Sequence, residues 1–436
     1  MTGPPVVFFS QIGYISSPMA RQFDIPIFYR SRIISSIKRY RKENDRRKSD
    51  LSPSILDVGK IRFKIARHFG FCFGVENAIE IAYRALDENP DRRVFLLSEM
   101  IHNPRVNGDL QERGIRFLQT QYGEQLIPFE ELTKDDIVIV PAFGTTVELF
   151  ERLKGIGIDP QVYNTTCPFV ERVWKRASEL GTRGYTIIIH GKHTHEETRA
   201  TFSHARLSGP SVVVRDREQA LTLTKYMTGV LPVEEFATDF KGLVSEGFDP
   251  ERDLQKVGVV NQTTMLASET QEISDLIKEA LQRHYGAAEI NNHYADTRDT
   301  LCYATSENQD ATKGLIEAGG DLAIVVGGYN SSNTSHLVEL LEEHVPTFYV
   351  KDAEEIISIS EIRHLDLKNS QVKTTHQWLD AEKERLEVLV TAGASCPDAL
   401  VDEVVTKISS LMEQEQFLEA AIRKYDVSDS ALAVVS

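Results

Sequence analysis

The chain has 436 residues, 41% hydrophobic and 26% charged, which is the composition of an ordinary globular protein rather than a disordered or fibrous one. Its net charge of −16 argues against sequence-independent nucleic-acid binding, and no apolar stretch approaches the roughly 18 residues that suggest a membrane span. We therefore expect a soluble protein of about three domains, with neither a nucleic acid nor a membrane as partner.

The N-terminal region differs in charge from the rest of the chain. Residues 1–60 carry 11 Lys and Arg against 5 Asp and Glu, a balance of +6, which leaves −22 for the remainder. We expect a basic, partly disordered extension. Its acid-poor start is typical of an organelle transit peptide, and the alternative is an extension on a bacterial protein with translation starting at Met19. The expected compartment is the cytoplasm, or a plastid if residues 1–60 include a transit peptide.

From residue 61 onward, short β-branched runs end in polar loops, and each loop leads into an amphipathic stretch. The runs that we expect to be strands are 137–140, 187–189, 257–260, 322–326 and 388–390. The stretches that we expect to be helices begin near 75, 147, 265, 336 and 398. This alternation predicts an α/β fold with mostly parallel sheets, whose ligands bind beyond the carboxyl ends of the strands. Residues 225–255 and 354–386 are polar and weakly periodic, so we expect surface insertions there.

Several expected helices begin with hydroxyl or amide side chains, at Thr263, at Ser331, Ser332 and Asn333, and at Ser395. One such side chain is most often only an N-cap. Three such loops, together with glycine-rich turns, favour a binding site for an anionic ligand at helix N-termini.

Histidines cluster at His190, His193 and His195, directly before Glu196 and Glu197. A zinc site is one interpretation, although the spacing differs from the helical His pair of metallohydrolases. Histidines that bind an anionic ligand are the interpretation that fits the neighbouring loops better.

The four cysteines are too few and too dispersed for a disulfide scaffold, and they form no local zinc pair. Cys72, Cys167 and Cys302 each lie in a loop directly before an expected helix, where the helix N-terminus favours the thiolate. They are either buried structural thiols or, if they converge, ligands of an iron–sulfur cluster with one iron open to substrate.

Seven motifs occur in an order that resembles 4-hydroxy-3-methylbut-2-enyl diphosphate reductase, the last enzyme of the non-mevalonate isoprenoid pathway. The resemblance runs from about residue 62 to 410 and is greatest to the longer plant and cyanobacterial branch. The motifs are 70–79, 99–103, 164–168, 191–197, 261–264, 330–333 and 391–395.

The resemblance implies a trefoil of three similar α/β units around a central [4Fe–4S] cluster. The expected units are 73–167, 168–301 with the insertion 225–255, and 61–72 plus 302–436 with the insertion 354–386. It implies that Cys72, Cys167 and Cys302 are the three cluster ligands and that Glu197 donates a proton. Thr263 would orient the substrate, and the residues implied to bind its diphosphate are His102, His195, Ser331, Ser332, Asn333 and Ser395.

The implied reaction removes the allylic hydroxyl of the substrate as water, with two electrons from ferredoxin or flavodoxin, and yields isopentenyl and dimethylallyl diphosphate. The alternatives are a diphosphate hydrolase or lyase, and a cluster-based redox sensor that binds an isoprenoid diphosphate without turnover. Phe143 stands where short bacterial members carry a third diphosphate-binding histidine, and Cys396 follows Ser395 where a cysteine is unusual. We expect Cys396 to be an inert thiol and Glu196 to point away from the site.

Overall fold

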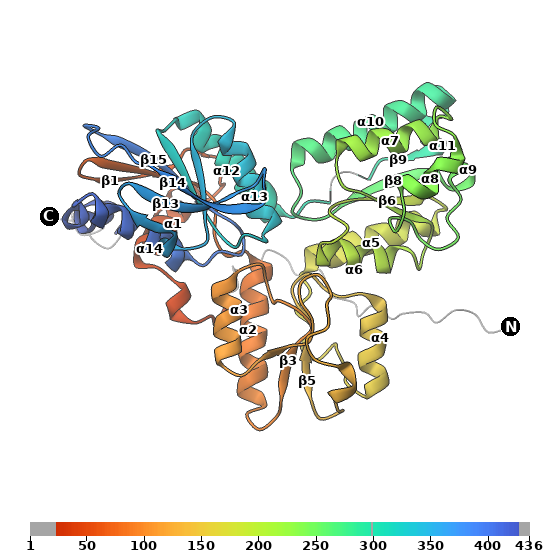
Figure 1. The fold of residues 1–436 in the computed structure, drawn as a ribbon, viewed down its shortest axis with the longest axis horizontal. Helices are drawn as coiled ribbons and strands as arrows, with labels where there is room; N and C mark the ends of the chain where they lie inside the picture. Colours follow the sequence, from red (N-terminus) through yellow and green to blue (C-terminus); the bar gives the residue numbers. More distant parts are fainter. Residues whose placement is uncertain (1–22, 298–299, 427–436) are drawn as a thin grey trace.

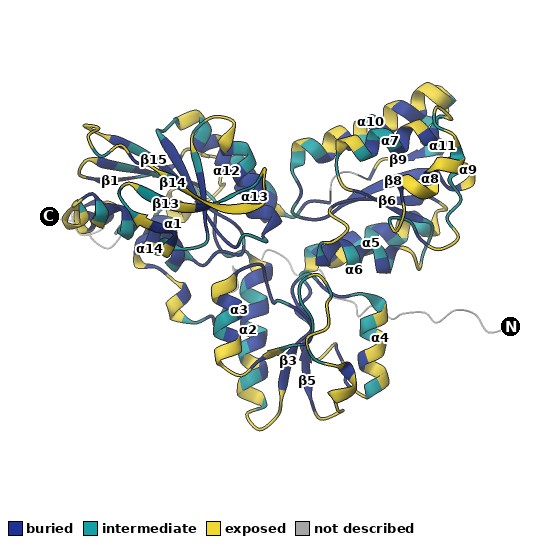
Figure 2. Ribbon diagram, viewed as in Figure 1, coloured by how far each residue is buried: buried dark blue, intermediate teal, exposed yellow. Residues whose placement is uncertain are grey.

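The computed structural model describes residues 23–297 and 300–426. Three units surround a common centre, each with its own β-sheet (Figure 1). The central strands are buried beneath helices whose outer faces are exposed, whereas the edge strand at residues 371–376 is exposed (Figure 2). The predicted α/β fold with mostly parallel sheets is confirmed.

The first unit contains a parallel sheet with strand order β4-β3-β5. Its elements are β3 (Val94–Leu96), β4 (Arg116–Phe117), β5 (Ile137–Ile139), α2 (Phe73–Glu88), α3 (Pro104–Glu112), η2 (Phe129–Glu131) and α4 (Val147–Ile156). One apolar cluster packs α2 and α3 on one side of the sheet, and a second packs η2 and α4 on the other. Both faces of this sheet are therefore covered, as expected of parallel strands.

The second unit contains a parallel sheet with order β7-β6-β8-β9. Its strands are β6 (Thr186–His190), β7 (Ser211–Val214), β8 (Val257–Asn261) and β9 (Tyr294–Ala295). Its helices are α5 (Pro168–Thr182), α6 (Glu196–Ala205), α7 (Arg217–Met227), α8 (Val233–Asp239), α9 (Pro250–Asp253), α10 (Ala267–Tyr285) and α11 (Ile290–His293). The segment 225–255 supplies α8 and α9, and Phe236 and Phe240 from it are buried in the core of the unit.

The third unit has an eight-stranded mixed sheet with order β1-β2-β15-β10-β11-β13-β12, and β14 pairs with β13. Its strands are β1 (Ser54–Val58), β2 (Ile61–Ile65), β10 (Leu322–Val326), β11 (Thr347–Val350), β12 (Ile356–Ser358), β13 (Glu361–Asp366), β14 (Gln371–His376) and β15 (Leu386–Ala392). Its helices are α12 (Tyr303–Ala318), α13 (Ser332–Glu342), η3 (Ala353–Glu355), α14 (Asp398–Leu411), η4 (Glu415–Phe417) and α15 (Leu418–Arg423). The segment 354–386 thus adds antiparallel strands to one end of a parallel centre.

Part of the expected N-terminal extension is folded. Residues 1–22 lie outside the described residues, but η1 (Ile27–Tyr29) and α1 (Arg32–Asn44) connect two units. Tyr29 is buried in the core of the first unit, whereas Ile34 and Ile37 are buried in that of the third. A transit peptide that covered all of residues 1–60 would remove these core side chains.

Basic side chains of this N-terminal region form ion pairs with acidic side chains of the third unit. Lys38 lies 2.6 Å from Asp398 on α14, and Arg32 lies 3.0 Å from Glu419 on α15. The Lys38 pair is partly buried, so the N-terminal helix is held both by apolar contacts and by charge.

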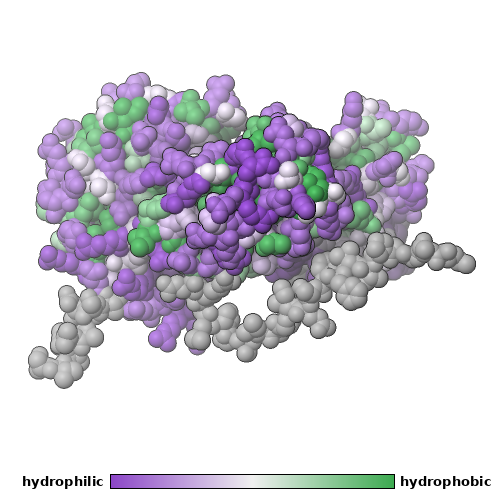
Figure 3. Space-filling view, turned by 90° about the horizontal axis from the view of Figure 1, so that it is seen from below, coloured by the Kyte–Doolittle hydropathy of each residue, from purple (hydrophilic) through white to green (hydrophobic). Residues whose placement is uncertain are grey.

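Within the described ranges, no helix is both long and apolar enough to cross a bilayer. Figure 3 shows hydrophilic side chains over most of one face, with hydrophobic ones in small separate groups.

Candidate active site

The three expected cluster cysteines begin one helix in each unit. Cys72, Cys167 and Cys302 are the N-cap residues of α2, α5 and α12. The backbone N–H of each cysteine donates a hydrogen bond to a backbone carbonyl in a loop that follows a strand. The acceptors are the carbonyls of Ala394 (3.2 Å), Ala142 (2.9 Å) and Thr263 (3.1 Å), respectively. Backbone hydrogen bonds therefore attach each thiol-bearing turn to the carboxyl-end edge of a sheet.

The thiols converge although they come from distant parts of the chain. A Cβ atom added at Gly74 would lie 2.7 Å from Cys167 Sγ and 4.0 Å from Cys72 Sγ. Burial is the main cause of the raised pKa of Cys72, and the nearby Cys302 and Cys167 thiols raise it further. Gly74 thus lacks a side chain at the place where thiols of two units approach each other.

The helix N-termini lower the thiol pKa values as expected, but burial outweighs their effect. Burial raises the pKa of Cys72 to about 12 and that of Cys167 to about 11, although backbone N–H groups of the helix starts act in the opposite direction. Desolvation of the charged form outweighs the partial positive charge of one helix end. Such thiols stay protonated in the absence of a cation, whereas coordination to a metal deprotonates a thiol outright.

Within residues 23–297 and 300–426, no three His, Cys, Asp or Glu side chains surround the position of a single metal ion. Thiolates on one zinc ion, at about 2.3 Å each, would lie within about 4 Å of one another. A four-iron cluster is larger than one ion and separates its thiolates more widely. Cysteine thiols are the usual ligands of iron–sulfur clusters, so a donor set of three convergent thiols from three units fits a cluster.

Glu197, in the first turn of α6, is 1% exposed. Its Oε1 accepts a hydrogen bond from the backbone N–H of Thr263 at 2.6 Å, and its Oε2 accepts from Thr263 Oγ1 at 2.9 Å. Burial raises the pKa of Glu197 to about 7, and the two Thr263 hydrogen bonds act against this rise. Glu197 is therefore a carboxyl group that can carry a proton near neutral pH, next to the thiols of Cys167 and Cys302.

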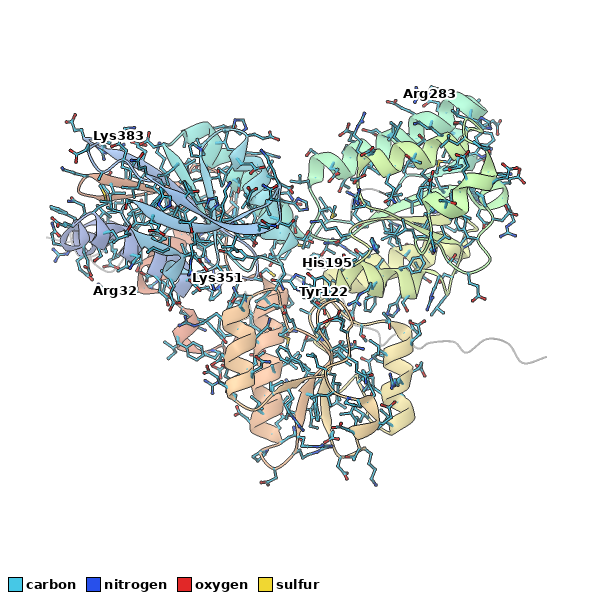
Figure 4. All side chains as sticks on the ribbon, in the orientation of Figure 1. Arg32, Tyr122, His195, Arg283, Lys351 and Lys383 are labelled. Carbon is cyan, nitrogen blue, oxygen red and sulfur yellow. The ribbon has the colours of Figure 1, made fainter. Side chains whose placement is uncertain are left out.

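His195 is the N-cap of α6, and its Nδ1 accepts a hydrogen bond from the backbone N–H of Glu197 at 3.1 Å. Burial lowers the pKa of His195 well below its usual value, so the imidazole is neutral. Because Nδ1 is an acceptor, the ring proton lies on Nε2. That Nε2–H is buried and has no hydrogen-bond partner in the described part of the chain. His195 thus offers one buried, unused donor near the centre of the molecule (Figure 4).

Phe143, which we expected at the position of a third histidine, packs on His102 and His195. Its ring lies 4.2 Å from that of His102 and 5.6 Å from that of His195, centroid to centroid. The His102 and His195 rings are themselves 4.9 Å apart. Phe143 therefore supports both imidazoles by contact and supplies no hydrogen bond.

Glu196 does not point away from the site, contrary to our expectation. Its Oε2 lies 3.2 Å from Nε2 of His102, both residues are buried, and its Oε1 has no hydrogen-bond partner among the described residues. Glu196 and His102 belong to different units. Because the two residues are far apart in the sequence, no local motif predicted their contact.

The Glu196 contact predicts a change in substrate affinity. Glu196→Gln keeps the size of the side chain but replaces the accepting carboxylate beside His102 with an amide, which weakens the hydrogen bond that orients the ring, so we expect KM for an anionic substrate to rise about tenfold. Steady-state kinetics on Glu196→Gln measures this, with Glu234→Gln on the exposed face of α8 as the matched control. A large loss of kcat at unchanged KM would instead make Glu196 the proton donor.

The remaining expected substrate-binding residues lie at the start of α13 and in the loop after β15, both in the third unit. Ser331 is the N-cap of α13 and accepts from the N–H of Thr334, which is the structural role that one such residue most often has. Ser332 Oγ lies 3.5 Å from His336 Nε2. Asn333 Oδ1 accepts from the N–H of Ala394 at 2.9 Å, whereas its Nδ2 is buried without a partner in the described ranges.

Ser395, in the loop between β15 and α14, connects the third unit to the first. Its Oγ donates to the carbonyl of His102 at 3.1 Å. A Cβ at Gly328 would lie 2.4 Å from the same carbonyl, so the glycine permits this close approach. The neighbouring Cys396 is fully buried, with its Sγ 3.6 Å from the carbonyl of Pro397, and burial raises its thiol pKa.

Hydrogen bonds of Gln121 join all three units, and the sequence did not predict them. The carbonyl of Gln121 in the first unit accepts from Arg199 of the second at 2.7 Å, and its Oε1 accepts from Asn330 of the third at 2.9 Å. Asn330 also donates to Glu99 at 2.7 Å. Figure 4 shows the adjacent Tyr122 near His195, where the units meet. Glu99 and Asn330 belong to recognised motifs, but Gln121 lies in a polar turn without any such signal.

Comparison with known proteins agrees with this geometry. A family model described as LytB protein matches residues 63–409. A 4-hydroxy-3-methylbut-2-enyl diphosphate reductase of Picosynechococcus sp. is 39% identical over 81% of this chain and 85% of its own length. One from Prochlorococcus marinus is 38% identical over 92% of this chain and 95% of its own length.

Among solved structures, the E-1-hydroxy-2-methyl-but-2-enyl-4-diphosphate reductase from Plasmodium falciparum aligns with a TM-score of 0.55 and 21% identity. The alignment covers 80% of this chain and 88% of the Plasmodium chain. This similarity supports the fold alone. The family expected from the seven motifs is confirmed: the chain belongs to the LytB protein family.

Proposed function

We propose that this chain catalyses the reductive dehydroxylation of (E)-4-hydroxy-3-methylbut-2-enyl diphosphate to isopentenyl and dimethylallyl diphosphate. In this reaction the allylic C–O bond breaks, two electrons and two protons are consumed, and the hydroxyl leaves as water. The reaction is the last step of the non-mevalonate isoprenoid pathway.

Cys72, Cys167 and Cys302 would hold one [4Fe–4S] cluster. Three partly buried thiols on three helix N-termini, around a position where Gly74 has no side chain, support this assignment. When bound, such a cluster supplies a Lewis-acidic iron and a path for single electrons.

Glu197 would hold the proton for the departing hydroxyl. Its burial keeps a proton on the carboxyl group near neutral pH, and the two hydrogen bonds from Thr263 fix its orientation. Thr263 therefore positions Glu197 directly, and we propose that its hydroxyl oxygen also orients the substrate by accepting a hydrogen bond.

The diphosphate would be bound by donors that are buried and unused. His195 Nε2–H and Asn333 Nδ2 both lack a partner in the described residues, and a buried donor without a partner costs about 1–3 kcal/mol. A diphosphate oxygen would satisfy each of them. The N-termini of α6 and α13 add partial positive charge, and His102, Ser331, Ser332 and Ser395 complete the proposed set.

One arrangement carries the proposal. The two unused donors, on His195 and Asn333, occur together with the Glu197 carboxyl group, whose pKa is about 7, and with three convergent thiols. No observation favours the redox sensor, which needs no proton donor, and the relatives bear the name of a reductase. We propose ferredoxin or flavodoxin as electron donor, and the cytoplasm or a plastid as the compartment.

The direct test is anaerobic purification with quantification of iron, sulfide and zinc, followed by turnover of the allylic alcohol diphosphate with a reduced dye. We expect about four irons and four sulfides per chain, and release of both isomeric products. Stoichiometric zinc without sulfide, or a loaded protein that binds the diphosphate without turnover, would refute the proposal.

A further inference from the structure

Aromatic side chains accompany the expected cluster ligands along the chain. Phe73 and Tyr303 directly follow a ligand, and Phe169 follows one after a single proline; all three lie in the first turns of their helices. We call them the aromatic trio. Phe73 is 37% exposed, Tyr303 is 39% exposed, and Phe169 is half-buried.

Contacts between units join the trio into one surface. The Tyr303 hydroxyl accepts a hydrogen bond from the backbone N–H of Phe73 at 3.3 Å, and its ring lies 5.1 Å from that of Phe169. The trio therefore presents exposed aromatic surface within one or two residues of every expected cluster ligand.

Basic side chains border the trio. Lys48 Nζ lies 5.9 Å from the centre of the Tyr303 ring, and the guanidinium of Arg172 lies 4.9 Å from that of Phe169. Arg46 and Arg47 are exposed in the turn that ends at Lys48. We call residues 46–48 the basic turn.

Two acids next to the basic turn already have cationic partners. Glu307 pairs with Lys48 at 2.7 Å, and Asp45 lies 3.5 Å from Arg67. Glu171 lies in the first turn of α5 beside Arg172. The charges of Arg46 and Arg47 thus leave this region positive, on a chain whose net charge is −16.

We propose that the aromatic trio and the basic turn form the docking surface for a small acidic protein that carries a one-electron redox centre. This inference rests on the proposed function, because each turnover must receive two single electrons, and two carriers are each oxidised by one electron. A carrier must approach the cluster closely, and the trio is the exposed surface adjacent to all three expected ligands. Opposite charge would steer an acidic carrier to this face and away from the acidic remainder of the chain.

A charge-reversal experiment tests the surface. Arg46→Glu/Arg47→Glu should weaken binding of a reduced plant-type ferredoxin on the order of tenfold at low ionic strength. At about 1 M salt, where the Debye length is about 3 Å, the difference should largely disappear. Turnover with a reduced dye should stay at the wild-type rate, because the dye needs no protein docking.

The matched control is Lys225→Glu/Arg283→Glu, which makes the same change in charge on two exposed residues that line one surface hollow of the second unit. Figure 4 shows Arg283 at the far end of that unit. It should bind ferredoxin as the wild type does. Equal weakening by both double variants would show a net-charge effect only and would overturn the docking surface, as would unchanged affinity of the Arg46/Arg47 variant.

The role of the trio needs a variant that changes no charge. Phe73→Leu should weaken ferredoxin binding equally at low and high salt, because it removes aromatic contact area alone. Unchanged affinity would remove the trio from the proposed surface. Failure of the wild-type chain to turn over with the dye would refute the proposed function instead, so the two failures are distinguishable.

Discussion

Glu197→Gln is expected to lower kcat by roughly 10²- to 10⁴-fold, the usual contribution of a positioned proton donor. The amide keeps the size of the carboxyl group and can still accept from the N–H of Thr263, so the site should keep its shape. We therefore expect the Kd for the substrate to change by less than about threefold, or below ~0.7 kcal/mol. Equilibrium binding and single-turnover kinetics on the cluster-loaded variant separate these two quantities.

The same group should set the upper pH limit of activity. A proton donor works in its protonated form, which is the dominant form below its pKa. Since burial raises the pKa of Glu197 to about 7, kcat/KM should be level below about pH 7 and fall as the pH rises through this value. A negatively charged diphosphate nearby raises such a pKa further, so the profile of kcat should break at a higher pH.

Two results would contradict this role. Near-normal turnover of Glu197→Gln would remove Glu197 from the chemistry. A profile that already falls near the ordinary glutamate pKa of 4.5 would show that the carboxyl group is not desolvated in the working enzyme. The wild-type enzyme assayed with substrate at saturation and at trace concentration provides both profiles.

Cys72→Ala should abolish cluster binding, whereas Cys396→Ala should retain the full content of iron and sulfide. Cys72 is the N-cap of α2 and lies among the convergent thiols. Cys396 is fully buried in the apolar core of the third unit, so its replacement removes packing only. A small cavity of this kind costs on the order of 1 kcal/mol of stability and no ligand.

Iron and sulfide analysis, together with the visible absorbance of the anaerobic proteins, measures both variants. Thermal unfolding of the two metal-free proteins serves as the control for misfolding. Equal loss of cluster from Cys72→Ala and Cys396→Ala would contradict a site of three ligands from three units.

The alternation of strands and helices was predictable because β-branched runs and glycine-rich turns carry it locally. The predicted run 322–326 is strand β10 in full, and 137–140 is β5 with one residue more. The packing of residues 23–44 was not predicted, because the basic composition of this segment is typical of a disordered extension. Ile33, Ile34 and Ile37, at helical spacing, were the available signal.

In the site, short motifs indicated which side chains are polar and close to a helix start, but not which ones meet. The hydrogen bond between His102 and Glu196 joins loops of two units, and no local pattern encodes such a contact. The thiol pKa values depend on how much water the other units exclude, which is also a property of the assembled molecule. The residues that cap helices could therefore be predicted from the sequence, whereas the desolvation of the thiols could not.

The order of strands in the third sheet has a consequence for biosynthesis. Strand β2 is encoded near the start of the chain, but its parallel partner β15 is encoded near the end. While the ribosome synthesises residues 66–385, β2 has only the short neighbour β1 to pair with, so the central sheet of this unit closes last. The first and second units can fold during translation, but all three thiols come together only when the chain is nearly complete. Maturation of the protein is therefore expected to be post-translational, and a chain that stops before residue 386 should neither close this sheet nor retain iron.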